Sequence, residues 1–241
     1  MSFKACPLCG RGDDGEQKPF DIIEHVAWKD IPFYHCQHCE IIFKDPRSWL
    51  SFEEEKIRYG FHHNVIENEG YVSYFDPLFD FLKRMDFENK YQHPRILDYG
   101  CGPNPVLQQL MQNKIHNNPI VEAYDPFFFS EGLSLARDAV WKYQLITMTE
   151  VLEHCYNPTA VITDILNLLD GSGLWFVQTR LWSDVKNFSN WWYVRDPTHV
   201  IFYSEKTLSW ICQKYHLTLL KTDHERSFLF QKNESPNDLQ N

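Results

Sequence analysis

Four cysteines near the N-terminus form two close pairs. Cys6 and Cys9 lie in "CPLC", and Cys36 and Cys39 lie in "YHCQHC", with 26 residues between the pairs. Two residues between thiols allow both sulfurs of a tight turn to face one ion, and four thiolates complete the tetrahedral shell that zinc prefers. The spacing therefore predicts a structural zinc site with no open coordination position. Four free thiols, or a redox pair, are the alternative.

A second cluster of reactive residues follows an apolar segment in "YQLITMTEVLEH". A helical turn there would project Glu150, Glu153 and His154 from one face. His199, in "RDPTHVIFYS", follows the next apolar segment and a long loop, and we expect it to return to the same place. Three interpretations stay open. All four residues could bind a divalent cation such as Mg²⁺, Mn²⁺ or Zn²⁺, His154 or His199 could be a catalytic general base, or the cluster could be structural.

The stretch "ILDYGCGPNPVL" (96–107) is typical of a strand that ends in a glycine turn and leads into a helix. Gly100 and Gly102 allow backbone N–H groups to approach a ligand at the helix N-terminus. A later strand is expected to end in "VEAYDPF", where Asp125 could accept both hydroxyls of a ribose. Asn104 stands where a dinucleotide turn has its third glycine. The pattern favours S-adenosylmethionine, which has a ribose and no phosphate. It also has an amino group beside which the negative charge of Asp98 would be favourable. A plain turn with a helix-capping Asp125 is the alternative.

The pattern of apolar runs predicts the elements that position these residues. Strands are expected near 95–99, 120–124, 143–148, 173–180, 217–221 and 227–231. Helices are expected over 104–114, 158–169 and 204–215. Strand–helix alternation predicts an α/β fold with a doubly wound, mostly parallel, Rossmann-like sheet. Because the last two strands are close in sequence, they could form an antiparallel hairpin at its edge.

The chain divides into four predicted parts. These are a small zinc-ribbon-like module (1–45), a helical linker or lid segment (46–92), a cofactor-binding domain (93–231) and a disordered tail (232–241). In the second part, helical spacing predicts one apolar face, made by Phe75, Leu78, Phe79 and Leu82.

Two aromatic segments are candidates for a lid over the site. The first is "RYGFHHN" (58–64), for which exposed loop residues are the alternative. The second follows the strand near residue 180, and packing in the core is its alternative. Its aromatic residues are Trp182, Phe188, Trp191, Trp192 and Tyr193.

Composition limits the classes of protein. The net charge is −10, from 23 basic and 33 acidic residues, which makes nucleic acid an unlikely partner because such binding depends on neutralising phosphates. No apolar run approaches the roughly 18 residues of a membrane span. An odd cysteine count of seven, and a start without an apolar signal core, predict a cytoplasmic protein. The sequence leaves the oligomeric state open.

Several motifs together resemble class I S-adenosylmethionine-dependent methyltransferases. They are "ILDYGCGPNPVL", "VEAYDPFF", "YQLITMTEVLEH" and "LLDGSGLWFVQT", and they cover roughly residues 93–222. Asn104 departs from the family pattern, and the short stretch between Asp125 and Gln144 leaves little room for the family's usual third strand and acidic adenine contact. A four-cysteine module ahead of such a domain resembles several bacterial methyltransferases, including sugar C-methyltransferases.

The resemblance implies roles for residues at the matching positions. It implies contacts of Asp98, Gly100 and Gly102 with the methionine end of the cofactor and of Asp125 with the ribose, and Thr149 and Glu150 as the floor of the pocket. The "EVLEH" stretch also resembles ubiquinone-pathway O-methyltransferases and small-RNA terminal 2′-O-methyltransferases.

We therefore predict methyl transfer from S-adenosylmethionine to a small or medium-sized acceptor, with the O, N or C acceptor atom left open. One alternative is a non-catalytic zinc-ribbon module on a degenerate methyltransferase fold that binds protein or RNA. A nicotinamide-dependent oxidoreductase is the other.

Overall fold

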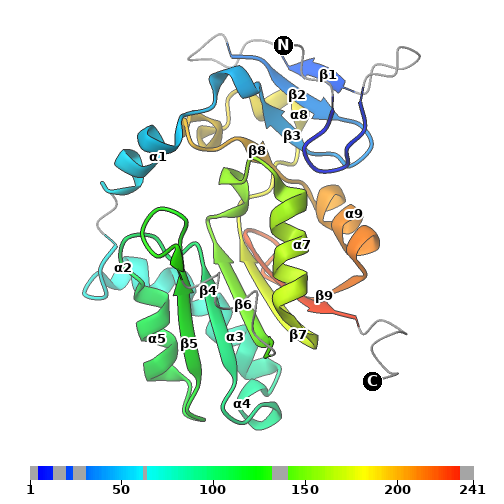
Figure 1. Ribbon diagram of the computed structural model, residues 1–241. Coiled ribbons are helices and arrows are strands. Elements are labelled where there is room, and N and C mark those ends of the chain that lie inside the picture. Colours follow the sequence, from blue (N-terminus) through cyan, green and yellow to red (C-terminus); the bar gives the residue numbers. More distant parts are fainter. Residues whose placement is uncertain (1–4, 13–19, 24–30, 62–63, 132–140, 234–241) are drawn as a thin grey trace.

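The computed structural model describes residues 5–12, 20–23, 31–61, 64–131 and 141–233, which form two sheets. The larger sheet has the strand order β5-β4-β6-β7-β10-β9 (Figure 1). Its strands are β4 (Arg95–Tyr99), β5 (Ile120–Tyr124), β6 (Tyr143–Thr149), β7 (Leu169–Gln178), β9 (Leu217–Thr222) and β10 (Ser227–Lys232). Strands β4 to β7 are parallel, whereas β10 runs antiparallel to both β7 and β9. The predicted mostly parallel sheet with an antiparallel terminal hairpin is confirmed.

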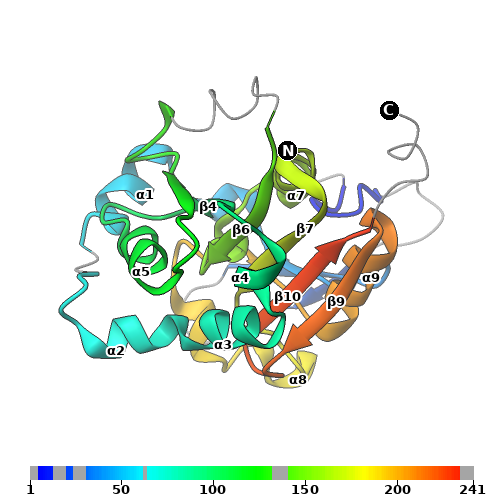
Figure 2. The ribbon, with the colours of Figure 1, turned by 90° about the horizontal axis from the view of Figure 1, so that it is seen from below.

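Helices cover both faces of this sheet, as Figure 2 shows from below. α3 (Asp76–Arg84), α4 (Phe87–Lys90) and α5 (Val106–Lys114) pack on one face, and α7 (Pro158–Leu168) and α9 (Glu205–Tyr215) pack on the other. Side chains alternate between the two faces of a strand, and accordingly Ile96 and Leu97 of β4 enter different cores. This is the doubly wound arrangement that the sequence predicts.

Short helices connect these elements. They are α1 (Phe52–Tyr59), α2 (Glu69–Val72) and α8 (Val185–Phe188), with 3₁₀ turns at Pro46–Ser48, Ser73–Phe75, Leu152–His154 and Trp192–Arg195. On α3 the predicted apolar face packs against the core, and Phe81 is part of it as well. Phe81 is buried with Leu78 and Leu82, whereas Phe79 is half-buried and lies under the Lys114 ammonium.

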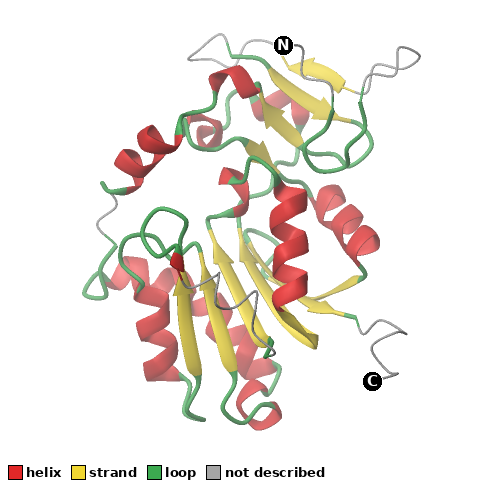
Figure 3. Ribbon diagram, in the orientation of Figure 1, coloured by secondary structure: helices red, strands yellow, loops and turns green. Residues whose placement is uncertain are grey.

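The smaller sheet lies beyond the carboxyl ends of the parallel strands (Figure 3). It has the order β1-β2-β3-β8 and is antiparallel throughout. Its strands are β1 (Phe20–Ile23), β2 (Phe33–Cys36), β3 (Ile42–Lys44) and β8 (Ile201–Phe202). By sequence, β8 belongs to the predicted 93–231 domain, yet it pairs with β3. The N-terminal residues and the segment around residue 200 therefore share one sheet.

The aromatic segment after β7 packs against this smaller sheet. Phe33 and Ile42 lie in one buried cluster with Trp182, Phe188 and Tyr193. These three aromatic residues therefore pack in the core, which was the alternative to a lid. Trp191 is half-buried against the same cluster, whereas Trp192 is 57% exposed.

The described residues also bear on the remaining expectations. No helix among them is both long and apolar enough to cross a membrane. Most of the predicted tail, from residue 234, lies outside the described residues, as do His62 and His63 of the first lid candidate.

Candidate functional site

The glycine turn between β4 and α5 has the backbone conformation that only glycine adopts readily. Gly100 has φ +82° and Gly102 has φ +68°. A Cβ atom on Gly100 would lie 2.4 Å from Cγ2 of Val151. Any side chain at residue 100 would therefore clash with Val151. A Cβ atom on Gly102 would meet nothing within 4 Å. Open space therefore borders the turn at Gly102.

Asp125 is tied to this turn. Its Oδ2 accepts a hydrogen bond from the Gly102 N–H at 3.0 Å, and its Oδ1 accepts from the N–H groups of Phe127 and Phe128 at 2.8 and 3.2 Å. The carboxyl group is buried, which raises its pKa, while the three N–H donors act in the opposite direction. Asp125 is thus a fixed acceptor beside Gly102 with remaining acceptor capacity on Oδ2. Its Oδ1 accepts from the N–H groups two and three residues further along, as a capping aspartate does, so the structure leaves both interpretations of Asp125 open.

Asp98, at the end of β4, lies in the interior of the same region. The Thr147 hydroxyl donates to its Oδ1 at 3.2 Å. Burial raises the pKa of Asp98 to about 7, with a smaller contribution from the charge of Asp125. Neither carboxyl group forms a salt bridge to a described residue. A cationic ligand group at this place would therefore stabilise both carboxylates.

Thr149 and Glu150 follow at the end of β6. The Thr149 hydroxyl oxygen is buried and has no hydrogen-bond partner among the described residues. Glu150 has φ +52°, and its N–H donates to the Gln178 carbonyl at 2.8 Å. Because a left-handed residue cannot belong to a right-handed helical turn, the turn predicted from residue 150 begins only at Leu152. Glu150 and Glu153 therefore do not share a helix face.

A tyrosine brings the two glutamates together instead. The Tyr193 hydroxyl lies 2.5 Å from Oε1 of Glu153 and 3.1 Å from Oε2 of Glu150. The Tyr74 hydroxyl donates to the other oxygen of Glu150. Burial, together with the charge of Glu153, raises the pKa of Glu150 to about 8. Glu153 is fully buried, and its Oε2 has no hydrogen-bond partner among the described residues.

His154 and His199 lie side by side, as the sequence predicts, with ring centroids 4.8 Å apart. Nδ1 of His154 is 3.0 Å from the Thr198 carbonyl, and Nδ1 of His199 is 2.8 Å from the Tyr193 carbonyl. Because a carbonyl can only accept, each Nδ1 carries the proton and each Nε2 keeps its lone pair. Burial lowers the pKa of both imidazoles, that of His199 to about 3.

These residues form a cluster with metal-ligand spacing. One ligand atom each from Glu153, His154 and His199 lies within 4.8 Å of the others. Glu150, the fourth residue of the predicted site, is not part of this group and is held by Tyr74 and Tyr193. Tyr74 was predicted only as part of a helical segment, and Tyr193 only as a lid or core aromatic. Neither has a local sequence signal for its contact with a glutamate.

Helix α1 lies next to the histidines. The Tyr59 ring packs edge-on against the ring of His154, with the two centroids 5.5 Å apart. The centroid of the Tyr59 ring is 5.2 Å from that of Phe127. Arg58 forms a salt bridge of 2.7 Å with Asp196, three residues before His199. Helix α1 thus joins the loop after Asp125 to the histidine cluster.

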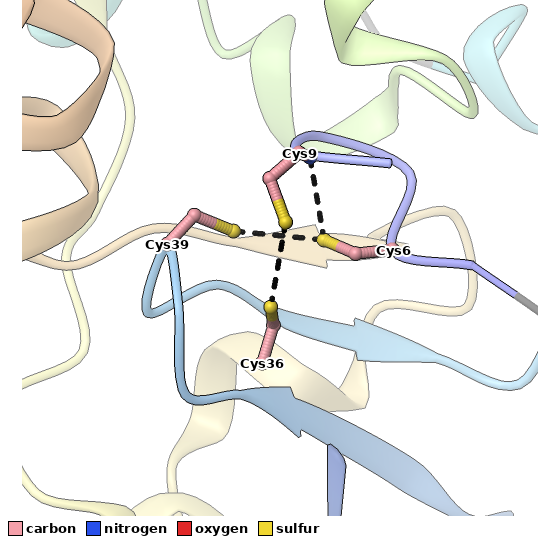
Figure 4. Close-up of side chains that lie close together, drawn as sticks. All are labelled: Cys6, Cys9, Cys36 and Cys39. Atoms are coloured by element: carbon pink, nitrogen blue, oxygen red, sulfur yellow. Dashed lines mark hydrogen bonds between the residues drawn. The ribbon is translucent and has the colours of Figure 1, made fainter. Parts of the chain in front are cut away.

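The four N-terminal cysteines face one point (Figure 4). Sγ of Cys6 is 3.5 Å from Sγ of Cys39, and Sγ of Cys9 is 3.7 Å from Sγ of Cys36. Sulfurs around a tetrahedral zinc ion are about 3.8 Å apart, given Zn–S bonds of about 2.3 Å. All four sulfurs lie within 4.8 Å of one another. The cluster predicted from the spacing therefore exists, and the two sulfur separations given above are close to those around zinc.

The fold and the glycine turn define a class of α/β domains that bind nucleotide-type cofactors at the carboxyl ends of parallel strands. Residues 71–222 match the model of a family described as "Methyltransferase domain". This match covers more than half of the sequence, and the chain belongs to that family.

The chain is also similar to solved structures. The chain is similar to an O-methyltransferase family protein from Burkholderia thailandensis (TM-score 0.53, 12% identity), over 83% of this chain and 66% of that one. It thus spans just under two thirds of that protein. It is also similar to magnesium protoporphyrin IX methyltransferase from Synechocystis PCC 6803 with bound SAH (TM-score 0.44, 14% identity), over 77% of this chain and 89% of that one. No curated protein matches the sequence.

Proposed function

We propose that this chain is an S-adenosylmethionine-dependent methyltransferase that acts on a small or medium-sized acceptor. One observation carries the proposal: in a chain of the methyltransferase family, the carboxylate of Asp125 is hydrogen-bonded to the backbone of Gly102, beside open space and close to buried Asp98. S-adenosylmethionine, when bound, supplies an electrophilic methyl group on a sulfonium.

The residues around the turn have complementary tasks in this proposal. Asp98, Gly100 and Gly102 hold the methionine end, and Asp98 accepts a hydrogen bond from its ammonium group. Asp125 accepts hydrogen bonds from the ribose hydroxyls. Thr149 and Glu150 form the floor. The buried Thr149 hydroxyl has no hydrogen-bond partner in the described ranges, which supports a polar ligand there.

The acceptor side is formed by Glu153, His154 and His199, for which we propose a divalent cation. The fit rests on two features. Both imidazoles present an unprotonated Nε2, and Glu153 has a buried oxygen that has no hydrogen-bond partner in the described part of the chain. Two imidazoles and one carboxylate suit Mn²⁺ or Zn²⁺ better than Mg²⁺. A bound cation would stabilise the deprotonated form of an acceptor hydroxyl, while Tyr193 holds Glu153 in place.

Without a cation, Nε2 of His154 would be the general base. Its proton on Nδ1 is held by the Thr198 carbonyl, and His154 is the more exposed of the two imidazoles. The very low pKa of His199 makes it a weak base. Manganese titration of the wild type distinguishes these two roles of the cluster.

The four cysteines hold a structural zinc ion in this proposal. Every ligand position of the ion is filled by a thiolate, so the site has no role in methyl transfer. The support is the sulfur geometry together with the burial of Cys6, Cys36 and Cys39.

Calorimetric titration with S-adenosylhomocysteine and, in parallel, NAD tests the cofactor assignment. We expect the wild type to bind the first and not the second. Asp125→Asn keeps an oxygen for the Phe127 N–H and should weaken binding at least tenfold, and Asp125→Ala should abolish it. Asp80→Ala, an exposed change on α3, is the control. Unchanged affinity in both Asp125 variants, or binding of NAD alone, would overturn the proposal.

A further inference from the structure

The smaller sheet, β1-β2-β3-β8, is called the N-terminal sheet from here on. Its strand β3 contacts the segment that carries His199. Ile42 pairs with Phe202 and Phe43 pairs with Ile201. The next N–H along, that of Lys44, donates to the Val200 carbonyl at 2.9 Å. The pairing of β3 with the β8 segment therefore continues to Val200, the residue directly after His199.

The Lys44 side chain holds the other end of the same segment. Its Nζ donates to the Pro197 carbonyl at 2.9 Å, and the residue is only 4% exposed. Burying an ammonium group is costly unless it is paired. Glu55 of α1, itself buried, is close enough for the Lys44 charge to oppose the rise that burial causes in the pKa of Glu55. One lysine thus fixes the backbone on both sides of Thr198 and His199.

Both imidazoles depend on that stretch of backbone. The Thr198 carbonyl accepts the hydrogen bond from Nδ1 of His154, and the Val200 N–H donates to the Glu153 carbonyl at 2.8 Å. His199 itself lies between Pro197 and Val200. A shift of this segment would therefore move His199 directly and remove the hydrogen bond that orients His154.

We propose that Lys44 is a positioning residue for the Glu153–His154–His199 cluster, so that the N-terminal sheet forms part of the acceptor side of the site. The inference rests on the proposed function of that cluster. It assigns the sheet a task that the closed four-cysteine site cannot perform, because a filled zinc shell has no contact with an acceptor. The hydrogen bonds described above for Asp98 and Asp125 come from the Thr147 hydroxyl and from backbone N–H groups, so the cofactor side should be independent of Lys44.

Lys44→Met tests this inference, because methionine has a similar shape without the N–H donors. Lys206→Met is the matched control, since Lys206 contacts Glu40, in the turn between β2 and β3, but is exposed. We expect Lys44→Met to keep its zinc content and its affinity for S-adenosylhomocysteine. Its affinity for Mn²⁺ should fall at least tenfold, as is typical when the support of a metal ligand is lost.

Histidine NMR gives a readout that needs no metal. With ¹⁵N-labelled histidine, the wild type should show His154 and His199 in the Nδ1-protonated form, and Lys44→Met should lose this pattern for at least one of them. Unchanged histidine signals with Mn²⁺ affinity within twofold of the wild type would overturn the inference. If the wild type binds no Mn²⁺, the metal proposal fails, while the histidine signals still decide the role of Lys44.

A second variant covers the case in which Lys44→Met does not bind S-adenosylhomocysteine. Lys44→Met combined with Glu55→Gln leaves no buried carboxylate without its cation. This double variant should bind S-adenosylhomocysteine and show the loss on the acceptor side alone. If it also fails to bind, Lys44 supports the whole fold, and the inference is wrong.

Discussion

Asp98→Asn should stabilise the protein without cofactor while preventing cofactor binding. Burial raises the pKa of Asp98 from its ordinary value of 3.8 to about 7. A carboxyl group whose pKa is raised on folding favours the folded state only while it is protonated. Its contribution is therefore fully present below about pH 4 and is lost as the pH rises to about 7. Ionised Asp98 destabilises the folded chain above that pH, and asparagine avoids this cost.

The size of the effect follows from the difference between the two pKa values. About three orders of magnitude in proton affinity correspond to about 4 kcal/mol in the free energy of unfolding. For a chain of this size, about 1 kcal/mol moves Tm by about 2–4 °C. The variant should therefore gain up to about 8–16 °C over the wild type at pH 8, and close to nothing at pH 4.

Thermal unfolding without cofactor, followed from pH 4 to pH 8, measures this difference. Asp80→Asn, a change on the exposed face of α3, is the control and should show no such pH dependence. At pH 8 the Asp98 variant should also bind S-adenosylhomocysteine at least tenfold more weakly than the wild type. A difference in Tm that does not grow with pH would refute the reasoning about burial. Normal cofactor affinity would refute the assignment of Asp98 to the methionine end.

Two further predictions concern the metal sites. Replacing Cys6 and Cys36 together by serine should reduce the zinc content, measured by atomic emission, by one ion per chain and should lower Tm; a wild type that is folded and free of zinc would contradict the four-cysteine assignment. Tyr193→Phe removes the hydroxyl that bridges Glu150 and Glu153, and it should weaken Mn²⁺ binding about tenfold while zinc content and S-adenosylhomocysteine affinity stay normal. Equal Mn²⁺ affinity would show that Tyr193 does not position Glu153.

Local patterns were enough to predict the larger sheet and the cysteine cluster. The buried strands appear in the sequence as apolar runs. The end of β4 is marked by the glycines that its turn requires. The Cys-x₂-Cys spacing likewise fixes which sulfurs can meet. The approach of His199 to His154 could be expected because the carboxyl ends of parallel strands lie at one edge of a sheet.

Contacts between distant and irregular segments could not be predicted in the same way. Strand β8 has two residues, too few to show a period, and it pairs with β3 from the other end of the chain. The left-handed Glu150 breaks the helical spacing from which a shared face was predicted. The contact between the Tyr193 hydroxyl and both glutamates depends on how a long loop folds back onto the smaller sheet. Such tertiary contacts have no local sequence pattern.

A crystal structure with bound S-adenosylhomocysteine would show whether the cofactor binds at the glycine turn. We expect to find the ribose hydroxyls on Asp125 and the amino group near Asp98. The backbone at Gly100 and Gly102 should lie against the methionine end, and the sulfur should face the side of Glu150 and the histidine cluster. A ligand bound elsewhere, or one whose ribose makes no contact with Asp125, would contradict this expectation.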